Sequence, residues 1–321
     1  MRNIAAAWAG LALALGACTA AAQPAFPTKP VRIIVPFAPG GGTDAFARTV
    51  GAKLTQTWGQ QVIVDNRAGA QGNIGTALGA KSPPDGYTLT LAYVGTLAIN
   101  PHLYKDPGFD ALKDFAAITR GTLEAWVLVV HPSLPVRTAK ELAALARQRP
   151  GQLTFASSAS GTQLVGELFK IVTKTNILHV PYKGAGPAVV DLLAGNVQIM
   201  WSNPTAAVPH VKNHRLQGLM VTGNKHLEAL PQLPNALEAG FPRLDVYGWY
   251  GMVAPAGTPP AILTKLNTDF VDALNAADVR ERMKATGQEL SPSSVQEFQE
   301  QIRKDYALWG EVVKASGARV D

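Results

Sequence analysis

Cysteine is almost absent from this sequence of 321 residues, and that absence limits the available chemistry. The single cysteine, Cys18, lies in an apolar N-terminal segment, so the remainder of the chain contains no thiol. Disulfides, zinc–thiolate sites and thiol nucleophiles are therefore excluded from a folded region that follows this segment.

Charged residues are also scarce, at 16% of the sequence, and Lys and Arg form no runs. The formal net charge of +6 favours mild attraction of small anions. Scattered cations without interleaved aromatic residues do not indicate a nucleic-acid surface, so we expect no nucleic-acid partner. Hydrophobic residues reach 47%, which argues against disorder, and the chain length predicts two globular domains.

The first residues have the pattern of a signal peptide. Arg2 precedes the apolar run Ile4–Ala17, which is too short to span a bilayer. The small residues Ala20–Ala22 then offer a cleavage site. We therefore predict that residues 1–22 form a signal peptide and that the protein is exported.

Cys18 leaves a second outcome open. The string Leu15–Cys18 resembles a bacterial lipoprotein cleavage box, which would give a lipid-anchored protein beginning at the cysteine. We favour cleavage after Ala22, because the alanine site lies directly ahead of the predicted folded region.

The most informative stretch is a glycine loop between a predicted strand and a predicted helix. Val31–Phe37 is a β-branched run, which Pro39–Gly42 cannot continue. Apolar residues then recur at every fourth position: Phe46, Val50, Leu54 and Trp58. Thr43 and Asp44 suit the N-cap of that helix. Because glycines permit close approach and a helix N-terminus favours negative charge, the loop predicts an anion site; an ordinary tight turn is the alternative.

Strand and helix patterns alternate along the rest of the chain. Further predicted strands are Gln61–Asn66, Thr88–Val94, Trp126–His131, Leu153–Ser158, Ile177–Tyr182, Val197–Ser202, Leu216–Thr222 and Val246–Pro255. Further predicted helices are Asn73–Lys81, Thr138–Arg149, Thr162–Thr173, Gly186–Ala194, Ala206–Asn213, Ala261–Ala276 and Ser293–Ala315. This alternation predicts an α/β fold with mostly parallel sheets flanked by helices.

The order of the segments predicts that the chain leaves one domain, builds a second and then returns. We assign residues 23–124 and 247–321 to domain 1 and residues 125–246 to domain 2. The cleft between the two domains is the predicted binding site.

Two more predicted strands end in loops of the same kind. Residues 157–162 and 179–187 are rich in Ser, Thr and Gly, and each stretch leads into a helix. Ligands of open α/β sheets bind beyond the carboxyl ends of the strands. Three neutral, donor-rich loops therefore predict a carboxylate clamp made of backbone N–H and hydroxyl groups. Each loop alone is equally well explained as an ordinary capped helix start.

Several longer strings resemble one protein family. They are Pro27–Asp44, Val64–Ala70, Gly72–Gly75, Pro84–Tyr87 and His179–Gly184. They resemble the tripartite tricarboxylate transporter receptors, which are Bug-type periplasmic solute-binding proteins, and the resemblance covers the chain after the signal segment. It implies a two-domain, Venus-flytrap fold in the periplasm. It also implies capture of a small mono- or dicarboxylate for a membrane permease, with no catalysis and no cofactor, by a monomer.

The same resemblance implies the residues of the site. One carboxylate would be held by Ala38, Gly40, Gly41, Gly42 and Thr43 together with Lys183, Gly184, Ala185 and Gly186. The other end of the ligand would be read by variable loops containing Thr96, Ser158, Gly161, Thr162 and Asn203. Family members often carry Asp directly before the residue matching Asn203, whereas this chain has Ser202. That departure implies a ligand without an amine.

A dinucleotide-dependent enzyme is the competing interpretation. Gly40-x-Gly42-x-x-Ala45 follows a strand, and Asp65 lies about twenty residues further on, as the dinucleotide fingerprint requires. Export counts against this interpretation, because a diffusible nicotinamide cofactor is not normally supplied outside the cytoplasm. A phosphate-binding loop of the Lys-Ser/Thr type does not fit, since no such pair follows the glycines.

Other catalytic patterns are sparse. His210 and His214 are spaced to share a helix face, but no third ligand accompanies them, so we expect no metal site. No Gly-x-Ser-x-Gly elbow is present. We therefore expect Ser157, Ser158 and Ser160 to form hydrogen bonds rather than act as nucleophiles.

The aromatic strand near the C-terminal quarter leaves two roles open. Tyr247, Trp249 and Tyr250 would either wall the cleft or belong to the core. Lys183 would either face a charge on the ligand or stand in solvent.

Overall fold

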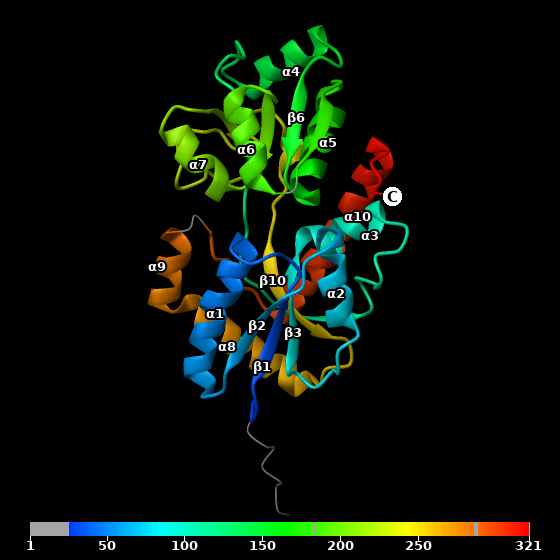
Figure 1. Cartoon of the computed structure of the whole chain (residues 1–321), viewed down its shortest axis with the longest axis vertical. Coiled ribbons are helices and arrows are strands. Elements are labelled where there is room, and N and C mark those ends of the chain that lie inside the picture. The colour runs from blue at the N-terminus through cyan, green and yellow to red at the C-terminus, as the bar shows by residue number, and fades with distance from the viewer. Residues whose placement is uncertain (1–25, 183, 286–287, 321) are drawn as a thin grey trace, which may run out of the picture.

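The computed structural model describes residues 26–182, 184–285 and 288–320. These residues form two lobes stacked along the long axis of the molecule (Figure 1). Each lobe contains a five-stranded sheet, with strand order β2-β1-β3-β10-β4 in lobe 1 and β7-β6-β8-β5-β9 in lobe 2. The predicted signal peptide, residues 1–22, lies outside the described residues.

Lobe 1 is assembled from both ends of the chain. Its strands are β1 (Val31–Val35), β2 (Val62–Asn66), β3 (Thr88–Tyr93), β4 (Phe115–Arg120) and β10 (Tyr250–Pro255). Its α-helices are α1 (Gly42–Trp58), α2 (Asn73–Ala80), α3 (Asn100–Leu103), α8 (Pro260–Asn275), α9 (Ala277–Ala285) and α10 (Val295–Ser316). A 3₁₀ turn, Ala70–Gly72, precedes α2, and a π-helical turn, Gly95–Ile99, precedes α3.

Lobe 2 is built from the middle of the chain. Its strands are β5 (Val127–Val130), β6 (Thr154–Ser157), β7 (Leu178–Pro181), β8 (Ile199–Ser202) and β9 (Gln217–Val221). Its α-helices are α4 (Ala139–Gln148), α5 (Ser160–Thr173), α6 (Ala185–Ala194) and α7 (Pro204–Lys212), and a 3₁₀ turn spans Pro242–Leu244.

The prediction of an α/β fold with helix-flanked sheets is confirmed, but both sheets are mixed rather than mostly parallel. β1 runs parallel to β2 and β3, and β6 runs parallel to β7 and β8. β10 is antiparallel to β3 and β4, and β5 is antiparallel to β8 and β9. The reason is topological, since β5 and β10 are the strands by which the chain enters one lobe from the other.

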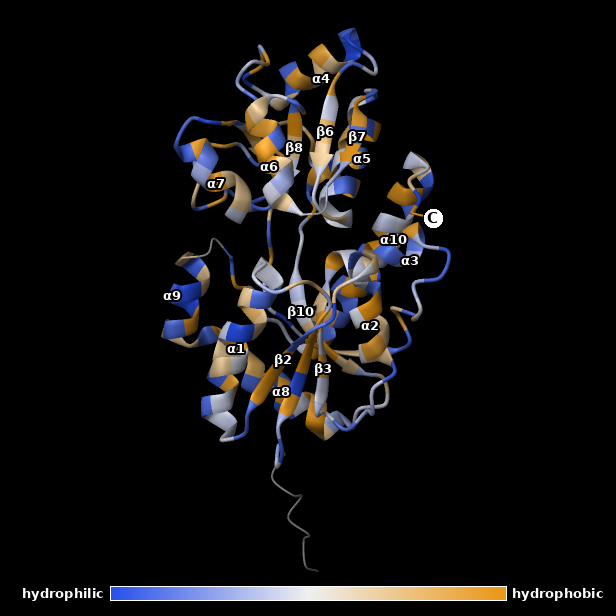
Figure 2. Cartoon of the chain, in the orientation of Figure 1, coloured by the Kyte–Doolittle hydropathy of each residue, from blue (hydrophilic) through white to orange (hydrophobic). Residues whose placement is uncertain are grey.

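Burial on both faces explains the nearly continuous apolar strands. Within β5, Leu128 and Val130 join a core cluster that includes α4 and α5, whereas Val127 and Val129 join the cluster beneath α6 and α7. In lobe 1, α1 packs with α8, while α2 and α10 contact other parts of the sheet. Figure 2 shows the hydrophobic residues concentrated along the strands and inner helix faces. No helix among residues 26–182, 184–285 and 288–320 is long and apolar enough to cross a membrane.

Two chain segments connect the lobes and pair with each other. Glu124 and Gly248 form an isolated antiparallel bridge, with N–H···O distances of 2.7 and 2.8 Å. Beside the crossing, α10 of lobe 1 packs on α5 of lobe 2, and the rings of Trp126 and Trp309 lie 6.2 Å apart. The predicted domain boundaries fall in these crossing segments, and their position at 124/125 and 246/247 stays a prediction.

Candidate functional site

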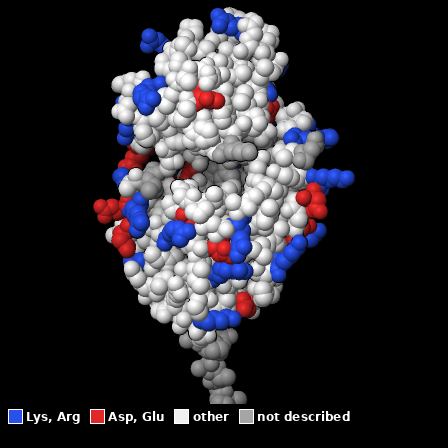
Figure 3. All heavy atoms as spheres, in the orientation of Figure 1, with Lys and Arg blue, Asp and Glu red and all other residues white. Residues whose placement is uncertain are grey.

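The molecule is hollowed between its lobes, and the surface that borders the hollow in this view is mostly uncharged (Figure 3).

The glycine loop that follows β1 has three differently placed glycines. Gly40 has φ +87°, a backbone conformation that favours glycine. A Cβ on Gly42 would lie 3.3 Å from Tyr250 Oη and 3.0 Å from Gln288 Nε2, whereas a Cβ on Gly41 would meet no atom within 4 Å. Packing therefore accounts for Gly42, but not for Gly41.

Helix α1 begins earlier than the N-cap prediction requires, at Gly42 rather than at or after Asp44. Gly41 is the N-cap, so Thr43 and Asp44 both lie in the first turn, and the prediction that one of them caps the helix is wrong. The Asp44 carboxylate instead accepts hydrogen bonds from Gly40 N–H, Arg48 Nε–H and the Asn66 amide, each at 3.0 Å. Burial raises the pKa of Asp44, but these hydrogen bonds outweigh it and lower the pKa below its ordinary value.

Asp44 thereby changes which donors of the loop are free. Gly40 N–H is occupied by the Asp44 carboxylate. Within the described part of the chain, the N–H groups of Gly41, Gly42 and Thr43 have no hydrogen-bond partner. A helix N-terminus normally leaves such groups unpaired, and they are suited to an acceptor of negative charge.

The start of α5 supplies a comparable edge from lobe 2. Thr162 Oγ1 accepts from Ser158 N–H at 3.0 Å and from Ala159 N–H at 3.1 Å, and donates to Ala159 O at 2.9 Å. The Thr162 hydroxyl therefore holds the loop in shape. A Cβ on Gly161 would lie 2.6 Å from Tyr93 Oη, which places a lobe 1 hydroxyl directly against this helix start.

Asn203 caps the start of α7 and reaches the same region. Its backbone oxygen accepts from Ala206 and Ala207 N–H at 3.1 Å. Its side chain lies near the Tyr250 hydroxyl and lowers the pKa of that phenol, against burial, which raises it. Ser202 stands at the position where the resembling family often carries Asp. It is fully buried, and its hydroxyl donates to Asn203 O at 3.2 Å.

Two tyrosines and a glutamate connect these helix starts. Sequence reasoning left Tyr250 open as cleft wall or core, and it did not assign Tyr93 or Glu124 to the site. The rings of Tyr93 and Tyr250 lie 5.7 Å apart, with Phe37 beside the first and Phe46 beside the second. The Tyr250 hydroxyl lies next to the Glu124 carboxyl group, and each group shifts the pKa of the other. The available signal was Glu124 itself, an acid immediately before the apolar run 125–130.

The electrostatics of this cluster follow from its burial. Glu124 is only 5% exposed, and burial raises its pKa to about 7, against the hydrogen bond from Tyr250, which lowers it. Burial also raises the pKa of Tyr250 and of Tyr93, with the Glu124 charge contributing in the same direction. Both phenols are therefore neutral hydrogen-bond donors at physiological pH.

Thr96 is fully buried, and its hydroxyl donates to Tyr93 O at 3.0 Å, so its side chain stabilises the turn after β3. Next to it, the loop before α2 is strained. Ala70 and Gln71 have φ of 45° and 51°, a conformation that costs non-glycine residues about 1–3 kcal/mol each. A Cβ on Gly72 would lie 2.7 Å from Thr96 Cγ2, so this strained loop packs directly against the turn after β3.

The loop before α6 contributes an exposed edge of lobe 2. Helix α6 begins at Ala185 at the end of lobe 2 that faces lobe 1 (Figure 1). Gly184 has φ +115°, and neither it nor Gly186 would bring a Cβ within 4 Å of another atom. Lys183 lies outside the described residues. The side chain of Ala38 is exposed at the opposite, lobe 1 side.

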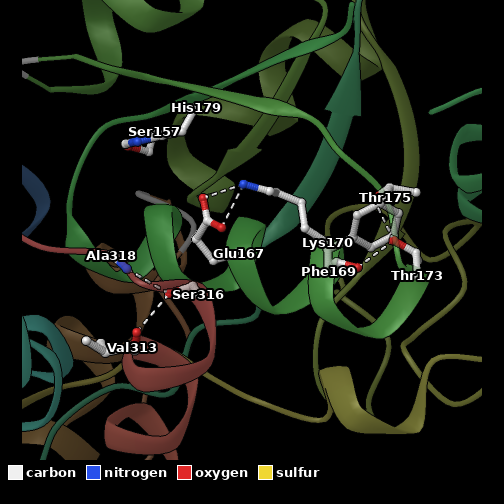
Figure 4. Close-up of polar contacts among 10 residues, drawn as sticks. All are labelled: Ser157, Glu167, Phe169, Lys170, Thr173, Thr175, His179, Val313, Ser316 and Ala318. Carbon is white, nitrogen blue, oxygen red and sulfur yellow. Dashed lines mark hydrogen bonds and ion pairs between the residues drawn. The ribbon is translucent and has the colours of Figure 1, made fainter. Parts of the chain in front are cut away.

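Ser157 and His179 form a hydrogen-bonded pair on the α5 face of lobe 2 (Figure 4). Ser157 Oγ lies 2.7 Å from His179 Nε2, and burial followed by the Lys170 charge lowers the pKa of His179 to about 4. The nearby Glu167 pairs with Lys170 at 2.8 Å and not with the imidazole. Ser157 thus hydrogen-bonds a neutral histidine that has no carboxylate partner within the described residues.

The remaining predicted alternatives separate clearly. Trp249 is core, fully buried with its indole N–H donating to Asp305 at 2.7 Å, whereas the Tyr250 hydroxyl faces the glycine loop. Asp65, the acid of the dinucleotide fingerprint, forms ion pairs with Arg67 at 2.9 Å and Arg32 at 3.5 Å. Among described residues, no group of three His, Cys, Asp or Glu side chains could hold a metal ion.

Comparison with known proteins gives one consistent result. Residues 46–318 match the family model described as tripartite tricarboxylate transporter family receptor. Protein BugT of Bordetella pertussis is 36% identical over 317 residues, covering 98% of this chain and 95% of that protein.

Solved structures agree with this match. The R. palustris protein Rpa4515, solved with adipate, is 36% identical with a TM-score of 0.83, covering 92% of this chain and 100% of that one. MatC from Rhodopseudomonas palustris, with bound malate, is 29% identical with a TM-score of 0.80, covering 90% of this chain and 100% of that one.

Proposed function

The chain belongs to the tripartite tricarboxylate transporter receptor family, a family of periplasmic solute-binding receptors, and we propose that it captures a small organic mono- or dicarboxylate between its lobes. The observation that carries this proposal is the set of unpaired N–H groups at Gly41, Gly42 and Thr43 beside the neutral Tyr250 hydroxyl. We further propose that the bound acid is delivered to a tripartite tricarboxylate-type membrane permease.

The chemistry of the donors favours an anion. A carboxylate that accepts several backbone N–H bonds at helix starts is stabilised without a neighbouring cation. Adipate and malate, which the two R. palustris structures contain, are both dicarboxylates, so the acid class has support from relatives. The residues that we propose to form the binding site are those predicted above: Ala38, Gly40, Gly41, Gly42, Thr43, Thr96, Ser158, Gly161, Thr162, Lys183, Gly184, Ala185, Gly186 and Asn203.

The described contacts divide these proposed roles. Gly40 N–H already serves Asp44, and the Thr96 and Thr162 hydroxyls serve their own turns. We therefore propose that these three act by shaping loops, and that the backbone at Gly41, Gly42, Thr43 and Gly161 makes the direct contacts. Export by residues 1–22, with Cys18 not lipidated, and a monomeric state belong to the same proposal.

A thermal-shift screen tests the proposal. A ligand that binds only the folded protein adds about 2.7 kcal/mol of stability at a hundredfold excess over Kd, which raises the melting temperature by a few degrees. We expect stabilisation by aliphatic mono- or dicarboxylates such as adipate and malate, but not by aspartate, glutamate or NAD. Stabilisation by NAD alone would favour the dinucleotide enzyme, and stabilisation by an amino acid alone would refute the ligand class.

A variant pair locates the site. Gly41→Val places a side chain where no atom lies within 4 Å, so the protein should fold but lose the ligand-induced shift. Thr57→Val changes an exposed residue near the other end of the same helix and should retain that shift. Equal shifts in both variants would place the ligand away from the glycine loop.

A further inference from the structure

Glu124 occupies an unusual position for an acid. It lies in the segment that crosses between the lobes, its backbone is fixed by the bridge to Gly248, and its side chain is 5% exposed. The neighbouring Tyr250 hydroxyl, which lowers the pKa of Glu124 against burial, lies 3.3 Å from where a Cβ on Gly42 would be, at the start of α1. A single side chain, Tyr250, therefore connects this carboxyl group to the glycine loop.

The groups around Glu124 do not neutralise its charge. β10 presents Tyr250, β3 presents Tyr93, and the start of α7 presents Asn203 against Tyr250. The segment after α9 adds the neutral Gln288 beside Tyr250 and the exposed Glu289. No Lys, Arg or His within the described ranges forms an ion pair with Glu124. An ionised Glu124 would thus be a buried, uncompensated anion next to a proposed anion site.

The hydroxyl of Tyr250 has one proton to donate. When Glu124 is ionised, this proton is donated to its carboxylate, and the hydroxyl offers the glycine loop only an acceptor. When Glu124 is protonated, it can donate to the tyrosine oxygen, which frees the tyrosine proton for a ligand oxygen. The protonation state of Glu124 therefore decides whether Tyr250 attracts or repels a carboxylate.

We propose that Glu124 is a positioning residue that must carry a proton for tight binding of the acid, because only then does Tyr250 donate to the ligand carboxylate. The inference rests on the proposed function, since it assumes a carboxylate ligand at the glycine loop. It adds a pH dependence and a selectivity for anions that loops of backbone N–H groups alone would not have.

The expected pH dependence has a definite direction. The pKa of Glu124 is raised by burial to about 7 in the free protein, and a bound anion raises it further. Affinity should be constant below about pH 6.5 and fall by up to about tenfold per pH unit above pH 7, until Glu124 is ionised in the complex as well.

The test is calorimetric titration of the full chain with adipate and with malate between pH 5.5 and about pH 8.5. Wild type should weaken by about tenfold to thirtyfold across that range, while Glu124→Gln, whose amide can donate to Tyr250 at every pH, should bind with an affinity that does not change. Glu167→Gln removes another buried carboxylate, one paired with Lys170, and should keep the wild-type profile. Tyr250→Phe should bind weakly at every pH, because the donor is gone.

The alternative outcomes are distinct. If the affinities of wild type and Glu124→Gln depend on pH in the same way, the role of Glu124 is overturned, while carboxylate binding by the protein still stands. Affinity that rises with pH in wild type and is lost in Glu124→Gln overturns it, because the ionised form of Glu124 would then be the one that supports binding. Absence of any heat with either acid at any pH overturns the proposed function and this inference together.

Discussion

Replacing the carboxyl group of Glu124 by an amide should change the pH dependence of folding stability. The pKa of Glu124 is raised from 4.5 to about 7 because burial disfavours its charged form. At about 1.4 kcal/mol per pH unit, this shift corresponds to about 3 kcal/mol. A folded-state pKa above the unfolded value means that the stabilisation is fully present below pH 4.5 and is lost as the pH rises through about 7.

Glu124→Gln has no proton to lose, so it should escape this loss. We expect its free energy of unfolding to match wild type near pH 4.5 and to exceed wild type by up to about 3 kcal/mol at pH 8. Urea unfolding at a series of pH values, followed by fluorescence of the buried tryptophans, measures the difference. Glu300→Gln, on an exposed face of α10, is the control and should follow the wild-type curve.

The refuting result for this argument is also clear. A difference between Glu124→Gln and wild type that stays constant from pH 4.5 to 8, or that shrinks as the pH rises, would show that Glu124 is already ionised at low pH. The proton-dependent role of this residue would then have no physical basis.

Other contacts give further expectations. Trp249→Phe deletes the indole donor to the buried Asp305 carboxylate, so unfolding in urea should show a loss of about 1–3 kcal/mol; an unchanged midpoint would contradict the contact. Lys284→Ala breaks an exposed ion pair with Glu228 that joins the lobes, and we expect no measurable change in the urea midpoint, whereas a clear drop would reveal a buried contact. Solution scattering should show a smaller radius of gyration with saturating adipate if the lobes close on a hinge, and an unchanged radius would argue against closure.

Local signals in the sequence were sufficient for the elements that matter most to the site. The β-branched run before Pro39 and the apolar stripe from Phe46 to Trp58 correctly predicted β1, its glycine loop and α1. The same kind of signal predicted β6 with α5 and β7 with α6, because each pattern lies within a few adjacent turns or strand residues. The predicted start of α1 was wrong, because the Asp44 carboxylate does not cap the helix. It accepts hydrogen bonds from Gly40, Arg48 and Asn66 instead.

The elements and residues that were missed depend on contacts between distant segments. β4 lies at the edge of its sheet and is defined by pairing with β10, which lies more than a hundred residues away in the sequence. The antiparallel direction of β5 and β10 follows from the path of the chain between the lobes. The sequence of neither strand indicates that direction. Glu124, Tyr93 and Tyr250 come from three separate segments, so their proximity could not be read from spacing. That the predicted loops share one cleft was indicated by the rule that ligands of open α/β sheets bind beyond the carboxyl ends of the strands, and by the family resemblance.

A crystal structure of the full chain with adipate or malate would test the central claim most directly. We expect a ligand carboxylate within hydrogen-bond distance of the N–H groups of Gly41, Gly42 and Thr43, with the Tyr250 hydroxyl as an additional donor. A carboxylate held instead by Lys or Arg side chains outside the hollow between the lobes would contradict the account.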